Sequence, residues 1–247
     1  MGYEPLTLEG WKYLGSGGEA AAYRGIVDLS KITDGVVHHK GVDSVFRAGG
    51  EPQHAFLTNL VAALLDTAFA LGGKYAHRHI PQPLGLAEAI GMKDGYFYEH
   101  VEGSDGFPWD FPGDFGHHVA LEEWIDFCNA FSGTGIGIAH DIVHPEDGRV
   151  SQNIILRSYE ISDLINGTLT SDWARIDFGY SSCPVSWEKF SAYLAEHKEK
   201  LKSLLGSMAD VLLLAYNAGT MQLDPREVME RYHRELQISH IKFFNHL

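Results

Sequence analysis

The segment from Ile138 to Gly179 places three polar side chains where a loop and two apolar runs meet. It reads I-A-H-D-I-V-H-P-E-D-G-R-V-S-Q-N-I-I-L, then a polar insert, then W-A-R-I-D-F-G-Y. Asp141 stands on a loop, Asn153 opens one apolar strand run, and Asp177 closes another. These are the parts needed to place a hydroxyl nucleophile beside a metal-bound triphosphate. The fold must therefore bring this loop and the ends of both strands together.

A cluster of glycines near the start of the chain predicts a turn that a phosphate could approach. The text W-K-Y-L-G-S-G-G-E-A-A-A-Y-R-G-I-V contains Gly15, Gly17 and Gly18 before an alternating run that can pair back as a hairpin. Glycines leave backbone N–H groups uncovered, so phosphate oxygens can reach them. The same pattern is also an ordinary hairpin turn in many sheet proteins, and the cluster alone does not separate the two readings.

The order of these motifs resembles the catalytic core of the protein-kinase-like phosphotransferases, in an atypical or minimal bacterial form related to protein kinases and to aminoglycoside and choline kinases. The resemblance covers most of the chain. It implies a two-lobed α+β fold, with a small antiparallel-sheet N-lobe carrying one helix (1–103) and a mainly helical C-lobe (104–247). It also implies ATP and Mg2+, with Asn153 and Asp177 holding metal and Asp141 orienting the acceptor hydroxyl.

The lysine that this family uses to hold phosphates is replaced. V-F-R reads as a strand that ends at Arg47 just before a helix, and the planar fork of arginine is not equivalent to a compact ammonium. Lys40 stays a second candidate if the strand lies earlier. The helix should begin near Pro52, repeat apolar residues at i, i+3, i+4 and i+7, and end at Gly72. Glu51, at its start, either orients the cation or simply complements the helix dipole.

The other periodic segments predict one strand pair and two C-terminal helices. The runs P-L-G-L-A-E-A-I and Y-F-Y-E-H-V-E-G flank the turn G-M-K-D-G, as in a hairpin. The second run resembles the hinge of the family, which implies that backbone groups from Glu99 to Val101 read the adenine edge. Amphipathic patterns predict helices over about 187–216 and about 225–246.

The catalytic segment departs from the family pattern in three ways. His-Arg-Asp appears as A-H-D, and Asn153 lies farther from Asp141 than usual, with a D-G-R turn that could loop out between them. Asp147 is a second candidate ligand, because H-P-E-D mimics Lys-Pro-Glu-Asn. No Ala-Pro-Glu follows Gly179, where protein substrates usually dock, and this favours a compact or small-molecule relative.

The composition restricts the partners. With 33 acidic and 19 basic residues the net charge is -14, which repels nucleic acids and anionic membrane surfaces. Cys128 and Cys183 lie far apart without a C-x-x-C spacing, which fits a reducing cytoplasm. The longest apolar run, L-V-A-A-L-L-D-T-A-F-A-L, is interrupted by Asp66, so we expect no membrane span.

We therefore expect an ATP- and Mg2+-dependent transfer of the γ-phosphate to a hydroxyl acceptor. A Ser or Thr of a protein is slightly preferred over a small cationic molecule of the aminoglycoside or choline type. A pseudokinase-like nucleotide-binding module stays open because of Arg47 and the altered His-Arg-Asp, and so does nucleotidyl transfer. A metal-dependent phosphohydrolase built on His140 and Asp141 is disfavoured, because its ligands need a helix and a proline follows almost at once.

Overall fold

The computed structural model describes residues 10–16, 20–32, 41–75, 77–90, 94–105, 125–138, 154–163, 168–176, 178 and 183–239. The first half forms an antiparallel five-stranded sheet with the strand order β1-β2-β3-β5-β4. The strands are β1 (Lys12–Ser16), β2 (Ala20–Val27), β3 (Val42–Gly49), β4 (Pro83–Leu86) and β5 (Gly95–Glu99). The predicted antiparallel sheet and its two hairpins are thus confirmed.

The central strand β3 separates two apolar clusters. Its side chains alternate between the faces of the sheet, as the pleat requires. Phe46 and Ala48 belong to a small cluster with β2 and β5, whereas Val45 belongs to the main core, which also contains residues of the long helix that follows β3. Arg47 comes two residues after Val45, so it shares the face that is turned to the main core.

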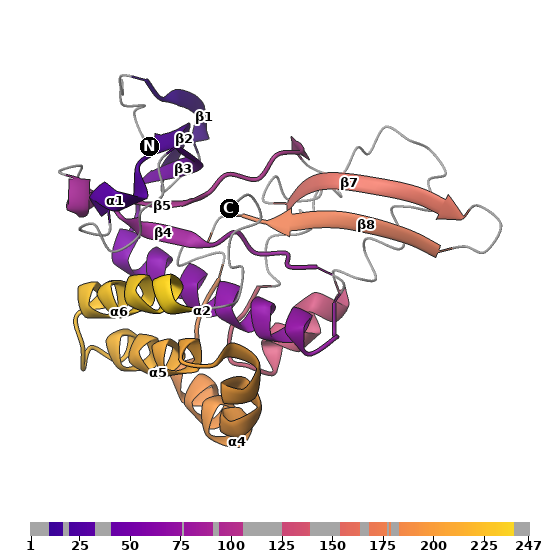
Figure 1. The fold of residues 1–247 in the computed structure, drawn as a ribbon, viewed down its shortest axis with the longest axis vertical. Coiled ribbons are helices and arrows are strands. Elements are labelled where there is room, and N and C mark those ends of the chain that lie inside the picture. Colours follow the sequence, from indigo (N-terminus) through magenta and orange to yellow (C-terminus); the bar gives the residue numbers. More distant parts are fainter. Residues whose placement is uncertain are drawn as a thin grey trace, which may run out of the picture.

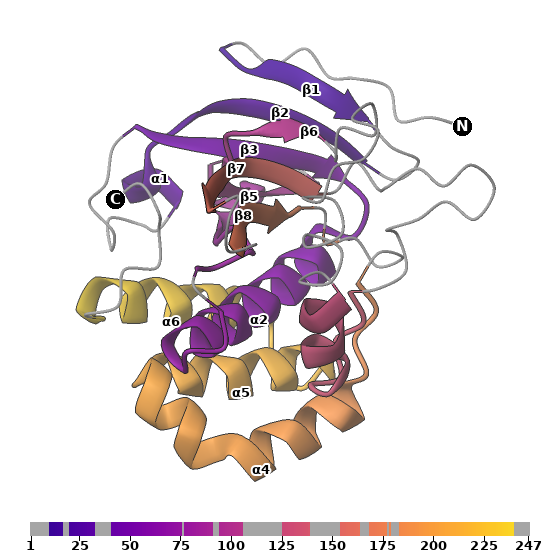
Figure 2. The same ribbon diagram turned by 90° about the vertical axis from the view of Figure 1, so that its right-hand side faces the viewer.

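The helix α2 (Pro52–Leu71) follows β3 and confirms the helix predicted from Pro52 to Gly72. It lies between the sheet and the C-terminal helices in both views (Figures 1 and 2). Among the described helices it alone is long and apolar enough to cross a membrane, by length and composition, with 20 residues and a mean hydropathy of 1.5. However, 78% of its apolar window is buried inside the protein, and packing accounts for the composition.

Three C-terminal helices follow: α4 (Trp187–Leu205) and α5 (Met208–Gly219) lie on the other side of α2, and α6 (Pro225–Ile238) packs beside α2 against α5 and β4 (Figure 1). The single helix predicted over 187–216 is wrong, because it is broken into α4 and α5. Gly206 has φ +59°, a left-handed conformation that ends α4. The second predicted helix is confirmed as α6, whose described part ends at Ile238 instead of His246.

The remaining strands form a second sheet in the order β6-β7-β8. They are β6 (Ser104–Asp105), β7 (Ile154–Asp163) and β8 (Thr168–Arg175), and the hairpin of β7 and β8 projects from the rest of the protein in Figure 1. These strands confirm the two apolar runs predicted on either side of the polar insert. Shorter elements are α1 (Leu29–Ile32), the 3-10 helix η1 (Ala87–Ile90) and a helical segment over 125–132.

One core cluster joins residues from both halves of the chain. It extends from Val45 in β3 and Tyr96 in β5 through α2 to Leu212 in α5 and Tyr232 in α6. The division into lobes at residue 103 therefore stays a prediction, because this part of the core is continuous across it.

Candidate functional site

The segment Glu99–Val101, which we call the hinge segment, is fixed to the sheet from two sides. The Glu99 N–H donates to the Gln82 carbonyl oxygen at 2.9 Å, and the His100 N–H donates to the Asp43 carbonyl oxygen at 3.1 Å. The Val101 N–H has no acceptor within the described part of the chain. The segment thus presents one backbone donor in a position that its neighbours hold in place.

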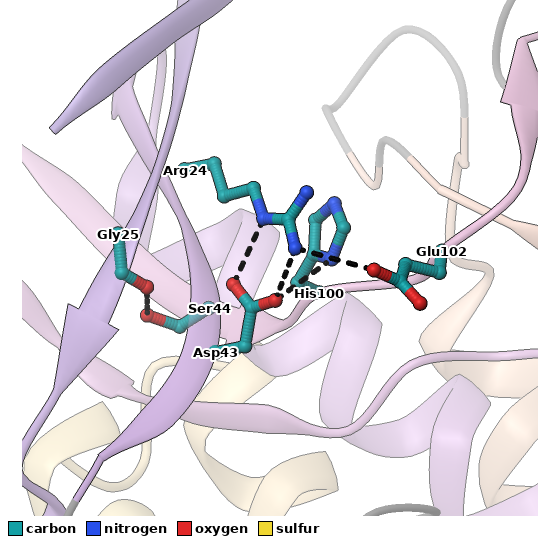
Figure 3. Close-up of polar contacts among 6 residues, drawn as sticks. All are labelled: Arg24, Gly25, Asp43, Ser44, His100 and Glu102. Carbon is teal, nitrogen blue, oxygen red and sulfur yellow. Dashed lines mark hydrogen bonds and ion pairs between the residues drawn. The ribbon is translucent and has the colours of Figure 1, made fainter.

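A group of charged side chains surrounds the start of the hinge segment (Figure 3). Arg24 in β2 donates two hydrogen bonds to the carboxylate of Asp43 in β3, one of 3.1 Å from Nε and one of 2.6 Å from a terminal nitrogen. His100 Nδ1 lies 3.3 Å from the Asp43 carboxylate, and Glu102 lies 3.5 Å from Arg24. The hydrogen bond with Asp43 raises the pKa of Arg24. Burial lowers the pKa of His100 although Asp43 opposes this effect, so His100 is neutral near pH 7.

The sheet face beside the hinge segment carries both charged and apolar side chains. Val45 in β3 pairs with Tyr98 in β5 and with Arg24 in β2, and two residues along the strand Ala22 pairs with Arg47. Directly paired residues share a face, so Ala22, Val45 and Tyr98 form an apolar strip between the Arg24–Asp43 pair and Arg47. Val45 and Tyr98 are buried in the main core, and Ala22 packs against it.

Arg47 lies at the far end of this strip, in β3, two residues before the strand ends at Gly49. Its side chain is buried, and one terminal nitrogen lies 3.4 Å from the Gly49 carbonyl oxygen. Gly50 makes room for it, because a Cβ at that position would stand 3.0 Å from the same nitrogen. Glu51 is exposed. The pairing of Glu51 with Arg47 stays a prediction.

The end of β8 is anchored to α2 through one buried carboxylate. Asp66 of α2 is fully buried and accepts the N–H groups of His79 and Ile80, at 2.5 and 2.8 Å. The His79 ring lies 4.1 Å from the Trp173 ring, and its carbonyl oxygen accepts the Arg175 N–H at 2.7 Å. The position after β8 is thus tied to the long helix.

The core continues directly past the end of β8. Phe178 is 1% exposed and belongs to the main core cluster that contains α2. Ile154 at the start of β7 pairs with Arg175 at the end of β8. Asn153 comes directly before Ile154, and Asp177 comes two residues after Arg175. The strand ends next to the two predicted metal ligands therefore lie side by side.

The predicted site residues divide into two groups. Gly15, Arg47, Glu51, Glu99 and Val101 are described, and Gly15 lies in β1 with open space where a Cβ would point. The others lie outside the described residues: Gly17, Gly18, Asp141, Asn153, Asp177 and the alternatives Lys40 and Asp147. The described residues contain no group of three His, Cys, Asp or Glu side chains that could hold a metal ion.

Three residues of the site were missed in the sequence. Asp43 and Gln82 fix the hinge segment through their carbonyl oxygens, and backbone contacts leave no mark on residue type. Asp66 was noticed only as an interruption of an apolar run. A lone carboxylate in the middle of a helix that is otherwise apolar indicates a buried acceptor, and this signal could have identified it.

The comparisons with known proteins give distant structural likenesses and no match in sequence. No protein-family model matches the sequence, and no curated protein matches it. Among solved structures, the chain is similar to the Rio2 kinase from Chaetomium thermophilum in its complex with ADP, Mg2+ and phosphoaspartate. The match covers 92% of this chain and 71% of the other, with 13% sequence identity and a TM-score of 0.40. At this level the functional argument depends on the residues of this chain.

Proposed function

We propose that this protein is an ATP- and Mg2+-dependent phosphotransferase of the protein-kinase-like type, which moves the γ-phosphate to a hydroxyl acceptor. The observation that carries the proposal is the Val101 N–H, which has no acceptor among the described residues, next to the apolar strip of Ala22, Val45 and Tyr98. A nucleobase needs both a flat apolar surface and an in-plane hydrogen-bond donor. The five-strand order with a helix after β3 is the scaffold that the sequence resemblance implied.

The positions along β3 fit an extended nucleotide. Asp43, at the hinge segment, and Arg47 lie four residues apart on one strand, which is about 13 Å at 3.3 Å per residue. A base at the hinge segment would place its phosphates toward Arg47, whose guanidinium can contact two oxygens at once. Arg47 thus takes the phosphate-holding role in this proposal, and the Gly49–Gly50 turn supports it.

The acceptor chemistry is assigned to residues outside the described part of the chain. Asp141 orients the acceptor hydroxyl and takes up its proton, and Asn153 and Asp177 hold Mg2+. The metal, when bound, neutralises charge on the phosphate oxygens. The anchoring of β8 to α2 through Asp66 supports this assignment, because it fixes the strand end that leads to Asp177.

We propose a Ser or Thr of a protein as the acceptor, with a small aminoglycoside- or choline-like molecule as the alternative. The net charge of -14 suits a cationic acceptor of either kind. We also propose a cytoplasmic location without nucleic-acid or membrane partners. Transfer to a basic peptide and to an aminoglycoside, measured side by side, separates the two acceptor classes.

A second candidate function is a nucleotide-binding module without turnover. It is favoured by the exposure of Glu51 at the start of α2. In active members of the family, by the resemblance, a helix acid orients the phosphate-holding cation. The two candidates differ in whether ADP is released.

Thermal stabilisation by nucleotides tests the binding part of the proposal. A ligand present at 100 times its Kd stabilises the folded state by about 2.7 kcal/mol, so binding raises the melting temperature. We expect MgATP to stabilise the wild type more than adenosine does. In Arg47→Met this difference should vanish, whereas Arg47→Lys should keep most of it because the charge remains. Equal stabilisation by ATP and adenosine in the wild type would exclude the proposed phosphate site.

A further inference from the structure

The outer edge of β4 is covered by side chains of α6. β4 is the last strand of the sheet that the described residues form, so among them its outward backbone groups have no neighbouring strand. Met229 Sδ accepts the Leu86 N–H at 3.2 Å, and His233 Nε2 lies 2.7 Å from the Leu84 carbonyl oxygen. A carbonyl oxygen only accepts, so this nitrogen of His233 carries a proton. The helix thus satisfies backbone groups that an edge strand leaves open.

A bulge in β4 creates one of these contacts. The pairing with β5 passes from Pro83 opposite Tyr98 to Gly85 opposite Phe97, so Leu84 is an extra residue in the strand. The extra residue of a bulge is left out of the ladder. Its carbonyl oxygen is therefore available to His233 of α6.

The contacts follow both elements in register. They occur in opposite order along the helix and the strand: Arg226 with Glu88, Met229 with Leu86, and His233 with Leu84. α6 therefore runs antiparallel to the β4–η1 segment and holds it along its whole length.

Gln82 connects α6 to the hinge segment. Its side-chain oxygen lies 3.4 Å from the Tyr232 hydroxyl, and its carbonyl oxygen accepts the Glu99 N–H at 2.9 Å. Gln82 and Tyr232 are both fully buried. Burial raises the pKa of Tyr232, and the nearby Glu99 carboxylate adds to the effect. A shift of α6 would therefore reach the first residue of the hinge segment through one side chain.

We propose that α6 is a positioning element for the nucleotide site, in which Tyr232, Met229 and His233 hold β4 and Gln82 transmits their position to the hinge segment. The effect on nucleotide binding rests on the proposed function, whereas the connection from α6 through Gln82 to the hinge segment rests only on the contacts described above. A backbone donor read by a base must keep its place, and α6 supplies that constraint from the end of the chain. Weakening α6 then weakens nucleotide binding without touching the reacting groups.

The experiment combines hydrogen exchange with steady-state kinetics on the full chain. Tyr232→Phe removes only the hydroxyl, and Met229→Leu removes only the sulfur acceptor at similar volume. Tyr193→Phe is the matched control, because Tyr193 is a partly buried phenol on α4 that stacks on His197 at 4.3 Å. The readouts are amide exchange over residues 95–101, the KM for MgATP and the kcat.

We expect both α6 variants to speed exchange of the Glu99 amide and to raise the KM by about threefold to tenfold, the range given by one lost hydrogen bond. The kcat should stay within about twofold, because only uniform binding is lost. The control should change neither quantity.

Exchange and KM equal to those of Tyr193→Phe in both α6 variants would overturn the inference. A uniform acceleration of exchange across the whole protein would also overturn it, because α6 would then only stabilise the fold. If the wild type binds no nucleotide, the proposed function fails by itself. The exchange of the Glu99 amide then decides whether α6 positions the hinge segment.

Discussion

Replacing Asp66 by Ala should destabilise the protein strongly, because the substitution leaves two buried donors without an acceptor. The carboxylate is fully buried and accepts the N–H groups of His79 and Ile80 at 2.5 and 2.8 Å. A hydrogen bond to a charged group contributes about 1.5–3 kcal/mol, so the two together contribute about 3–6 kcal/mol. A typical domain is stable by about 5–15 kcal/mol, so the loss is a large share of the total.

Urea denaturation followed by tryptophan fluorescence measures this loss. Trp173 is a suitable reporter because it is buried and lies 4.1 Å from the His79 ring. Asp66→Asn keeps the shape and one acceptor oxygen, so we expect a smaller loss of about 1–2 kcal/mol. Asp210→Asn, at an exposed position in the first turn of α5, should change the free energy of unfolding by less than about 0.5 kcal/mol.

A loss below about 1 kcal/mol for Asp66→Ala would refute the reasoning, because two buried N–H groups without an acceptor should destabilise the folded state by more than that. Equal effects of Asp66→Ala and Asp66→Asn would refute the assignment of the loss to the hydrogen bonds. In both cases the connection between α2 and the end of β8 would need another explanation.

Three further predictions concern the sheet and the core. Gly95→Ala should destabilise by about 1–3 kcal/mol in urea denaturation, because its Cβ would stand 2.5 Å from the carbonyl oxygen of Arg47; a neutral effect would contradict this packing. Burial raises the pKa of Cys128 to about 12, so this side chain should be a protonated thiol in the native protein at pH 8. A thiol reagent should label it only after unfolding, and rapid labelling of the native protein would argue against its burial. Asp43→Asn should lower stability by less than about 1 kcal/mol, because its ion pair with Arg24 is about one third exposed, and a loss well above this in the same assay would show that the pair is more than a surface contact.

The five-stranded sheet could be predicted because its signals are local. Glycine turns, a proline at the helix start and alternating apolar residues mark β1 to β5 and α2, and the structure agrees with them. The break between α4 and α5 was missed, because the amphipathic pattern continues across Gly206 while the backbone there turns to φ +59°. A single glycine is tolerated in many helices, so the conformation of Gly206 could not be predicted from the sequence.

The candidate site was predicted only in part. Arg47 and Val101 were named from motif order; the structure places Arg47 in β3 and Val101 two residues after β5, and their roles stay predictions. The role of Glu51 could not be judged, because the direction of a side chain at a helix start depends on the turn before it. The contacts of α6 with β4 could not be predicted, since they join side chains to backbone groups more than 140 positions away in the sequence.

The central claim is that this protein transfers the γ-phosphate of ATP. The most direct measurement is Mg2+-dependent ATP turnover with an acceptor mixture of basic peptides and aminoglycosides, comparing the wild type with Asp141→Ala and Asp177→Ala and separating ADP from AMP. We expect ADP as the product and loss of its formation in both variants. AMP as the product, ADP release that persists in Asp177→Ala, or nucleotide binding without any turnover would contradict the claim.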